Sequence, residues 1–234
     1  MKGVIIAAGD GGRLQPLTFT SPKVLLPMWD SPLISYPLQS MSAAGIREVV
    51  IVVGYRSRQV IEGVRKLLPP WMTAEFVHNP HFNGGNAISL AAAEAYVGDS
   101  PFILSMGDHI IEPGVAPALA ENPFDGPVLA VDTQPTLDSQ VNDATRVLRD
   151  GQGRIRRIGK HLKQWNAVDI GVFRFPASVF QTIRNLRRER GLELELNEVM
   201  QNLADDLMVG THDVAGLFWS DIDTLEDYRS VAAQ

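Results

Sequence analysis

The feature that most constrains the fold is an apolar run at residues 4–8 that leads directly into a cluster of glycines. An unbroken apolar run of this length is typical of a strand buried on both faces of a parallel sheet. A glycine-rich turn lets backbone N–H groups approach a phosphate closely, and Arg13 and Lys23 add two cations just beyond it. The segment therefore predicts a strand and turn that bind a polyphosphate.

This turn differs from two well-known phosphate-binding loops. No Gly-Lys-Ser or Gly-Lys-Thr follows the glycines, as a Walker loop requires, and Leu14 stands where a dinucleotide fingerprint has its third glycine. A different arrangement is expected, in which Arg13 takes phosphate oxygens bidentately and Lys23 is held on rigid backbone beside Pro22. The alternatives are that Arg13 braces the loop and that Lys23 is a surface lysine whose stem covers neighbouring leucines.

Short apolar runs alternate with helical patterns along the first half of the chain. This alternation predicts an α/β fold with a mostly parallel, Rossmann-like sheet flanked by helices on both faces. Ser31-Pro32 is expected to begin the first helix and Gly45 to end it. We expect strands at 3–8, 48–53, 74–78, 101–105 and 127–131, and helices at 31–44, 57–68 and 86–96.

After residue 132 the pattern changes to that of a small β/α lobe. A Gly-Gln-Gly turn between 145–150 and 154–158 predicts a hairpin, and 166–175 predicts another strand. Helices are expected at 177–190, 196–204 and 224–232. We expect a single domain over 1–234, in which this lobe lies over the carboxyl edge of the sheet, where ligands bind in open α/β folds.

Composition narrows the classes of function. The 234 residues include no cysteine, which excludes disulfides, thiolate chemistry and zinc–thiolate sites and favours a cytoplasmic location. The net charge is −6, so nucleic acid is not an expected partner and anionic ligands must be held by local cations. No apolar run reaches the roughly 20 residues that span a bilayer, and no targeting or membrane segment is expected.

A carboxylate is expected at the carboxyl edge of the sheet, because the apolar strand before Asp108 ends there. Mg²⁺ prefers hard oxygen ligands, and Asp221 and Asp223 are the candidates for a second carboxylate. These two alternate along an extended segment, so their side chains face opposite ways. We expect Asp221 to bind Mg²⁺ directly and Asp223 to lie behind it or to cap the helix at Thr224. Alternatively, Asp108 shapes a turn and the later aspartates begin a solvated acidic helix.

Four other positions carry weaker signals. Asn86 and Ser89 follow a glycine pair near the sheet edge, where they could contact a base or only cap a helix. Lys160 and Asp169 could reach a second substrate from the smaller lobe. None of these functional interpretations is specific on its own.

Two motifs together resemble the signature of the sugar-phosphate nucleotidyltransferase superfamily. That signature is Ala-Ala-Gly-x-Gly-x-Arg-Leu followed by Pro-Lys-x-Leu-x-Pro, and the chain has it at 7–14 and 22–27. The 16–21 stretch is more similar to the uridylyl- and thymidylyltransferases. Five other segments resemble the CTP:inositol-1-phosphate cytidylyltransferase branch, at 85–90, 102–109, 158–160, 168–171 and 219–224.

The resemblance implies attack by a phosphomonoester, called the acceptor below, on the α-phosphorus of a nucleoside triphosphate. Pyrophosphate leaves, and CTP with inositol 1-phosphate is the favoured pair, giving CDP-inositol. The acceptor phosphate has a second pKa near 6 and is already largely a dianion at pH 7, so no protein base is required. The alternatives are a sugar-1-phosphate uridylyl- or thymidylyltransferase using UTP or dTTP, a phosphocholine cytidylyltransferase, and an inactive regulatory subunit that binds nucleotide.

The resemblance also implies partners and residue roles. Inositol-type domains are often fused to a membrane alcohol-phosphotransferase, so a separate membrane-bound enzyme is expected downstream; the oligomeric state stays open. Residues 1–131 would bind the nucleotide and 132–234 the acceptor. Catalytic roles fall to Arg13, Lys23 and Asp108, and Mg²⁺ binding falls to Asp108, Asp221 and Asp223. Nucleotide contacts fall to Ala7, Ala8, Gly9, Gly11, Gly12, Asn79, Gly85, Asn86 and Ser89. Acceptor contacts fall to His109, Lys160, Asp169 and Gly171.

Overall fold

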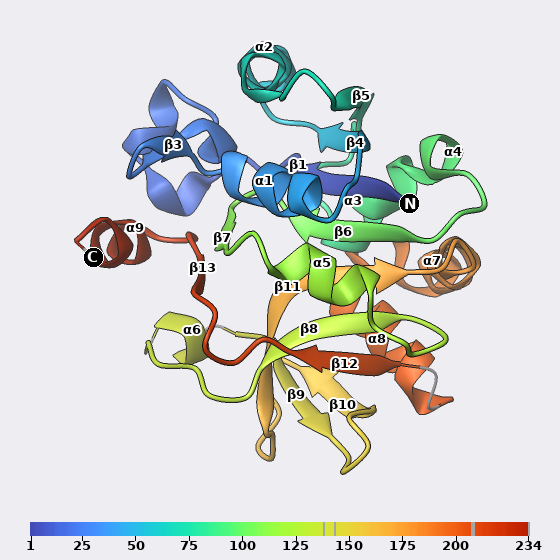
Figure 1. The fold of residues 1–234 in the computed structure, drawn as a ribbon. Helices are drawn as coiled ribbons and strands as arrows, with labels where there is room; N and C mark the ends of the chain where they lie inside the picture. Colours follow the sequence, from blue (N-terminus) through green and yellow to red (C-terminus); the bar gives the residue numbers. More distant parts are fainter. Residues whose placement is uncertain (138, 143, 207–208, 234) are drawn as a thin grey trace.

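The computed structural model describes residues 1–137, 139–142, 144–206 and 209–233. These residues form a nine-stranded mixed sheet with helices packed against it (Figure 1). Its parallel part consists of β1 (Lys2–Ala7), β4 (Glu48–Val53), β5 (Thr73–His78) and β6 (Phe102–Met106), in the order β6-β1-β4-β5. The predicted α/β class and these four predicted strands are confirmed.

Helices cover both faces of the parallel part because successive strand residues face opposite ways. Val4 lies in the core on one face and Ile5 in the core on the other. The Ile5 face is covered by α1 (Ser35–Ala43), α2 (Ser57–Leu67) and α5 (Val115–Ala120). The Val4 face is covered by α3 (Asn86–Ala92), α7 (Val179–Arg190) and α8 (Leu196–Asp205) (Figure 1).

The strand predicted at 127–131 exists as β8 (Val128–Asp132), but its expected place in the parallel sheet is wrong. The free edge of β6 is occupied by β11 (Ala167–Phe175), which runs antiparallel to both β6 and β8. A last strand, β12 (Gly210–Asp213), pairs in parallel with β8. The nine-residue β11 is buried along most of its length, which is why it occupies the centre of the sheet and displaces β8 outwards.

Two predicted helices differ in extent from those observed. Residues 31–32 form β3 (Ser31–Pro32), which pairs with β2 (Pro27–Met28), and α1 begins only at Ser35. The cause is local pairing, since Leu33 N–H donates to the Leu26 carbonyl and keeps the chain extended. The helix predicted at 86–96 divides at Ala93 into α3 and α4 (Glu94–Val97).

The predicted hairpin of the smaller lobe is confirmed as the antiparallel pair β9 (Arg146–Arg149) and β10 (Ile155–Gly159), next to β11. A short helix, α6 (Ser139–Asn142), precedes it. The chain then returns towards the parallel sheet, because β13 (Trp219–Asp221) pairs with β7 (His109–Ile111), and α9 (Leu225–Ala232) ends the fold (Figure 1). This return brings the C-terminal aspartates to the end of β6.

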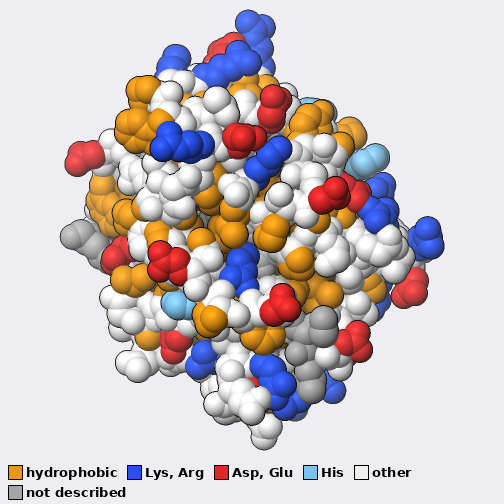
Figure 2. Space-filling model, turned by 45° about the vertical axis from the view of Figure 1, so that its right-hand side comes forward, with side chains coloured by type: hydrophobic (Ala, Val, Ile, Leu, Met, Phe, Trp, Pro, Cys, Tyr) orange, Lys and Arg blue, Asp and Glu red, His pale blue; other side chains and the backbone are white. Residues whose placement is uncertain are grey.

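On the face shown in Figure 2, acidic and basic side chains are interspersed. None of the helices formed by the described residues combines the length and apolarity needed to cross a membrane.

Candidate active site

The glycine turn after β1 is shaped for close packing against the segment that carries Lys23. Gly11 has φ +66°, and a Cβ at this position would lie 2.8 Å from the Lys23 Cβ and 3.0 Å from the Thr18 Cγ2. Only glycine suits both the left-handed backbone and this contact. The turn continues into a short 3₁₀ helix, η1 (Gly12–Leu14), and Gly12 N–H donates to the Asp10 carboxylate at 3.1 Å.

Lys23 lies at the centre of a buried ion cluster. Its side chain is only 9% exposed, and its Nζ lies 2.5 Å from Asp108 Oδ2 and 2.6 Å from Asp223 Oδ1. Arg13 Nη2 lies 2.7 Å from the other oxygen of Asp223. The alternative of a surface lysine is therefore wrong, and the two predicted cations meet two of the predicted carboxylates in one place.

The cluster keeps its members ionised. Burial alone would lower the pKa of Lys23, but the carboxylates of Asp108 and Asp223 raise it above its usual value. Burial alone would raise the pKa of Asp108, but Lys23 and His109 hold it well below its usual range. The pKa of Asp223 is also lowered, since Lys23 outweighs burial and the repulsion from Asp108. The site thus presents fixed charges of both signs near neutral pH.

The two C-terminal aspartates lie in different places. Asp221 is the last residue of β13 and pairs with His109 across the β7–β13 ladder, whereas Asp223 reaches Lys23. The expectation that Asp223 caps the last helix is wrong. Thr224 and Asp227 form that cap, because Thr224 N–H donates to Asp227 Oδ2 at 2.7 Å and Asp227 N–H donates to Thr224 Oγ1 at 3.2 Å.

A cavity of about 310 Å³ opens between the glycine turn and α3. Eight of the predicted site residues line it: Ala7, Gly9, Lys23, Asn86, Ser89, Asp108, His109 and Asp223. A second hollow of similar volume follows the turn, lined by Gly9, Asp10, Gly11, Gly12, Arg13, Lys23, Asp108 and Asp223. The two share Gly9, Lys23, Asp108 and Asp223, and so form a continuous surface along the predicted nucleotide-binding segments.

Three predicted nucleotide residues support this surface from behind. The buried Asn79 donates from Nδ2 to Ser89 Oγ at 3.0 Å, which fixes the position of that hydroxyl. The Ala8 carbonyl accepts from Tyr55 N–H, and Gly85 N–H donates to the Leu192 carbonyl. Their contribution to a bound nucleotide would be to hold its contacts in place.

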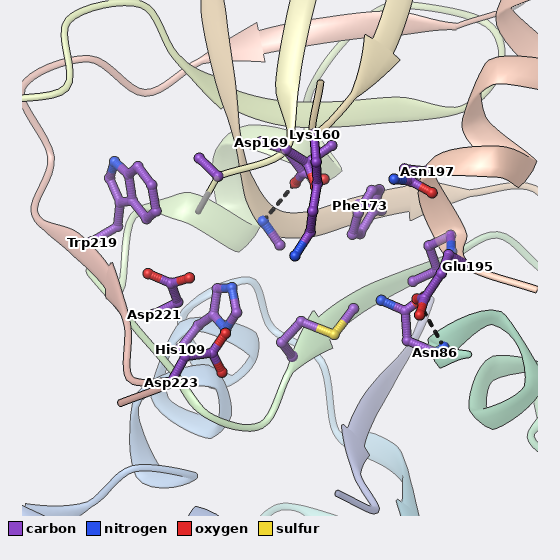
Figure 3. Close-up of a pocket in the computed structure, with 15 residues that line it drawn as sticks. Asn86, His109, Lys160, Asp169, Phe173, Glu195, Asn197, Trp219, Asp221 and Asp223 are labelled. Atoms are coloured by element: carbon purple, nitrogen blue, oxygen red, sulfur yellow. Dashed lines mark hydrogen bonds between the residues drawn. The ribbon is translucent and has the colours of Figure 1, made fainter. Parts of the chain in front are cut away.

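A larger cavity of about 430 Å³ lies between the parallel sheet and the smaller lobe (Figure 3). All four predicted acceptor residues line it: His109, Lys160, Asp169 and Gly171. Asp221 and Asp223 line it too. Asp223 is therefore both a member of the ion cluster and part of the wall of this cavity. The predicted site residues of the two halves are therefore brought together around adjoining cavities.

His109 connects the ion cluster to the larger cavity. Its Nδ1 lies 2.9 Å from Asp108 Oδ1, and a Cβ on Gly171 would lie 2.6 Å from its Nε2. Gly171, with φ +74° at an irregularity in the pairing of β11, thus leaves room for the ring. Burial alone would lower the pKa of His109, but the Asp108 carboxylate raises it.

The carboxylates of the larger cavity are in a different electrostatic situation from Asp108. Burial raises the pKa of Asp169 to about 6, although its hydrogen bond from Gly171 N–H, at 2.7 Å, acts in the opposite direction. Burial also raises the pKa of Asp221, against the attraction of His109. These two side chains can accept hydrogen bonds from a neutral, hydroxyl-bearing ligand.

Several residues of the larger cavity were not predicted from the sequence. Glu195 and Asn197 reach it from the start of α8, and Trp219 reaches it from β13. Glu195 also lines the smaller cavity. Its sequence context, an acidic residue before a helix, is typical of ordinary helix starts and carries no signal for a ligand site.

The comparison that identifies the family covers almost the whole chain. Residues 2–234 match the family model described as "Nucleotidyl transferase". The chain belongs to the nucleotidyl transferase family. It is 28% identical to the low-salt glycan biosynthesis nucleotidyltransferase Agl11 of Haloferax volcanii, over 97% of the chain and 64% of that protein. It is 32% identical to a bifunctional IPC transferase and DIPP synthase of Aquifex aeolicus, over 96% of the chain and 49% of that protein.

The chain thus spans between about half and two thirds of the length of these curated relatives. Among solved structures, the inositol-1-phosphate CTP transferase from T. maritima is 28% identical, with a TM-score of 0.85 over 99% of this chain and 94% of that one. A UDP-glucose pyrophosphorylase complexed with UDP-glucose is 19% identical, with a TM-score of 0.84 over 99% and 97% of the two chains, and shares the fold. The expected nucleotidyltransferase membership and fold are confirmed.

Proposed function

We propose that the protein is a Mg²⁺-dependent cytidylyltransferase that joins CTP to inositol 1-phosphate, releases pyrophosphate and forms CDP-inositol. The observation that carries the proposal is the Lys23–Asp108–Asp223 cluster, which lines the smaller cavity and, through Asp223, the larger one as well. The Lys23 ammonium, together with a Mg²⁺ ion held by the two carboxylates, would help to bring two polyanions together and neutralise their charge. The likeness to the T. maritima inositol-1-phosphate CTP transferase supports the choice of substrates.

The donor set at the cluster fits Mg²⁺. Oxygens of Asp108 and Asp223 approach one cation, Lys23 Nζ, within 2.6 Å. Within the part of the chain that the structure describes, no three His, Asp or Glu side chains form a ready metal site. A pair of carboxylates suits Mg²⁺, which takes one or two carboxylates and completes its shell with phosphate oxygens and water. Asp108 and Asp223 would hold the ion, which would neutralise charge on the phosphates.

We assign direct metal binding to Asp223. From the sequence alone we expected Asp221 to be the direct ligand. Asp223 shares Lys23 with Asp108, whereas Asp221 pairs with His109 and lines the acceptor cavity. Lys23, Arg13 and the N–H groups of the glycine turn would then hold the triphosphate. The acceptor phosphate needs no protein base, so the remaining task of the protein is to align it with the α-phosphorus.

The Asn79–Ser89 pair is compatible with CTP as the nucleotide. Asn79 Nδ2 donates to Ser89 Oγ, so a lone pair of that hydroxyl is used and its proton remains to be donated. The cytosine ring offers acceptors at N3 and O2, whereas N3 of uracil and thymine carries a hydrogen. A hydroxyl donor beside the glycine turn therefore suits N3 or O2 of cytosine, while O2 of uracil or thymine can accept from it as well.

A sugar-1-phosphate uridylyl- or thymidylyltransferase is the second candidate. The chain is 27% identical to a glucose-1-phosphate thymidylyltransferase of Streptomyces antibioticus, over 99% of the chain and 65% of that protein. The carboxylates of the larger cavity, Asp169 and Asp221, can accept hydrogen bonds from the hydroxyls of a sugar as well as from those of inositol.

We also propose that the reaction takes place in the cytoplasm and that a separate membrane-bound alcohol-phosphotransferase consumes the product. CTP and polar phosphomonoesters are cytoplasmic compounds. An activated CDP-alcohol stores a cleavable phosphoanhydride, whose use requires a second acceptor alcohol.

Pyrophosphate release tests the function directly. The purified protein is assayed with Mg²⁺ over a grid of CTP, UTP and dTTP against inositol 1-phosphate, glucose 1-phosphate and phosphocholine. Release with CTP and inositol 1-phosphate alone supports the proposal. Release only with UTP or dTTP and glucose 1-phosphate contradicts it, and no release in any combination favours an inactive, nucleotide-binding subunit.

A further inference from the structure

Two helices from different halves of the chain cap each other at the wall between the cavities. Glu195 Oε2 accepts from the backbone N–H of Asn86, the first residue of α3, at 3.1 Å. In return, Asn86 Oδ1 accepts from the backbone N–H of Leu196, the first residue of α8, at 2.7 Å. Since a helix start leaves its first N–H groups without intrahelical partners, each half satisfies one such group of the other.

This exchange fixes the orientation of the Asn86 amide. A backbone N–H only donates, so the atom that faces Leu196 must be the amide oxygen, and the two hydrogens of Nδ2 point the other way. Figure 3 shows the Asn86 nitrogen directed into the larger cavity. Among the described residues, no hydrogen bond from this nitrogen is seen to a protein group.

The opposite wall of the cavity has complementary chemistry. Figure 3 shows Asn86 and Glu195 on one side and His109 and Asp221 on the other, and all four line the same cavity. A ring with several hydroxyls can accept a hydrogen bond from Asn86 while it donates to Asp221. Asn86 also lines the smaller cavity, where Ser89 of the same helix, α3, can serve the nucleotide.

We propose that Asn86 is an acceptor-binding residue, contrary to the nucleotide role expected from the sequence. Its amide nitrogen donates to a hydroxyl of the polyol or sugar part of the acceptor, and Glu195 is the positioning residue that holds the start of α3 against α8. The inference deepens the proposed function and rests on it for the class of acceptor.

The test separates acceptor binding from nucleotide binding. Asn86→Asp keeps an oxygen for Leu196 N–H and removes the donor. Asn83→Asp adds the same charge in the same loop, at an exposed residue that is absent from the walls of both cavities. Steady-state kinetics give the KM of the acceptor, and titration calorimetry without acceptor gives the Kd of CTP in Mg²⁺.

Relative to Asn83→Asp, we expect Asn86→Asp to raise the acceptor KM roughly five- to ten-fold, the size of one lost hydrogen bond, with the CTP Kd within about two-fold. If the aspartate variant does not fold, Asn86→Ala must show the same result, a raised acceptor KM with a nearly unchanged CTP Kd. A rise in the CTP Kd with an unchanged acceptor KM overturns the inference, and so does no change in either.

The role of Glu195 and the substrate pair are tested separately. Glu195→Gln keeps an oxygen for Asn86 N–H and should restore the acceptor KM that Glu195→Ala raises; equal KM values in the two variants contradict a positioning role. If wild-type protein turns over another pair in the grid, the same measurements use that pair. The proposed CTP and inositol specificity then fails, while the assignment of Asn86 is still decided by comparing the change in the acceptor KM with the change in the nucleotide Kd.

Discussion

At the scale of single residues, Lys23 determines how charge is arranged in the site. Its ammonium group lies within 2.6 Å of two carboxylates and is nearly buried. A triphosphate entering the glycine turn would therefore meet a fixed cation whose position is already set by Asp108 and Asp223. Preorganised charge of this kind is among the largest contributions to catalysis.

Removal of a member of this cluster should therefore be costly. We expect Lys23→Ala and Asp108→Ala each to lower turnover by at least about 100-fold, by analogy with the loss of one preorganised electrostatic donor. Pyrophosphate release at saturating substrates measures the effect, and circular dichroism confirms that the variants fold. Near-normal turnover in a folded variant would remove that residue from the mechanism.

The two C-terminal aspartates should differ in their dependence on Mg²⁺. Asp223→Asn is expected to raise the Mg²⁺ concentration for half-maximal turnover by about ten-fold, as loss of one ligand carboxylate would. Asp221→Asn, two residues earlier, is the matched control. It should change this Mg²⁺ concentration less and should raise the acceptor KM instead. The reverse order of the two variants would return the ligand role to Asp221.

The ionised Asp169 carboxylate should lower the stability of the folded protein near neutral pH. Its pKa is raised to about 6 in the folded protein and is about 4 when unfolded, so the folded state binds more protons between these values and stability falls as pH rises through them. We expect Asp169→Asn to be more stable than wild type by up to about 3 kcal/mol at pH 7.5, with the difference vanishing towards pH 4.

Urea unfolding at several pH values measures this difference. Asp206→Asn, at an exposed position, controls for the loss of one negative charge. A variant Asp169→Asn that is less stable than wild type at pH 7.5, or a difference that grows as pH falls, would contradict the assignment.

The sequence predicted the location of Lys23 and Asp108 better than it predicted which aspartate meets Lys23. Lys23 and Asp108 follow short-range patterns, a glycine turn and the end of an apolar strand, and both predictions place them at the correct sheet edge. Which aspartate meets Lys23 depends on where β13 stops pairing with β7, a contact between segments about 110 residues apart. Glu195 depends on a similarly distant contact with Asn86, and no local pattern encodes either.

At the scale of elements, β11 is the strand that joins the two halves. It pairs with β6 of the parallel sheet and with β8 and β9 of the smaller lobe, and it places Asp169 and Gly171 against His109. The expected parallel position of β8 was wrong because a strand pattern shows that a strand exists and not which edge it occupies. The helix start expected at Ser31-Pro32 was wrong because the preceding segment offered a hairpin partner.

Arg174 should stabilise the connection between α5 and β8. Its guanidinium donates to the carbonyls of Leu119, Asn122, Phe124 and Gly126. Arg174→Met would leave these carbonyls without their charged donor, and we expect a loss of about 2–4 kcal/mol in the free energy of unfolding.

Urea unfolding measures this loss, and Arg58→Met, at an exposed residue of α2, is the control for removal of a surface charge. Arg174→Lys should recover only part of the loss, because an ammonium lacks the planar fork. A change below about 0.5 kcal/mol for Arg174→Met would show that water replaces the side chain without cost.

At the scale of the whole molecule, the site is assembled from segments spread along nearly the entire chain. The glycine turn and Lys23 come from the start, His109 from the middle, and Asp223 from the end. The fold class followed from the alternation of strands and helices, but the larger cavity also depends on the C-terminal segment, which pairs with β7 and supplies Trp219, Asp221 and Asp223 to its wall. Substrate choice is consequently a property of the assembled molecule.

The most direct measurement of that choice is a competition between substrates. One reaction with Mg²⁺ contains CTP, UTP, dTTP, ATP and GTP together with inositol 1-phosphate, glucose 1-phosphate and phosphocholine, each at equal concentration, and mass spectrometry identifies the products. CDP-inositol should be the main product, formed in equal amount with pyrophosphate. A UDP- or dTDP-sugar as the main product, or no nucleotidyl product at all, would contradict a CTP- and inositol-phosphate-specific transferase.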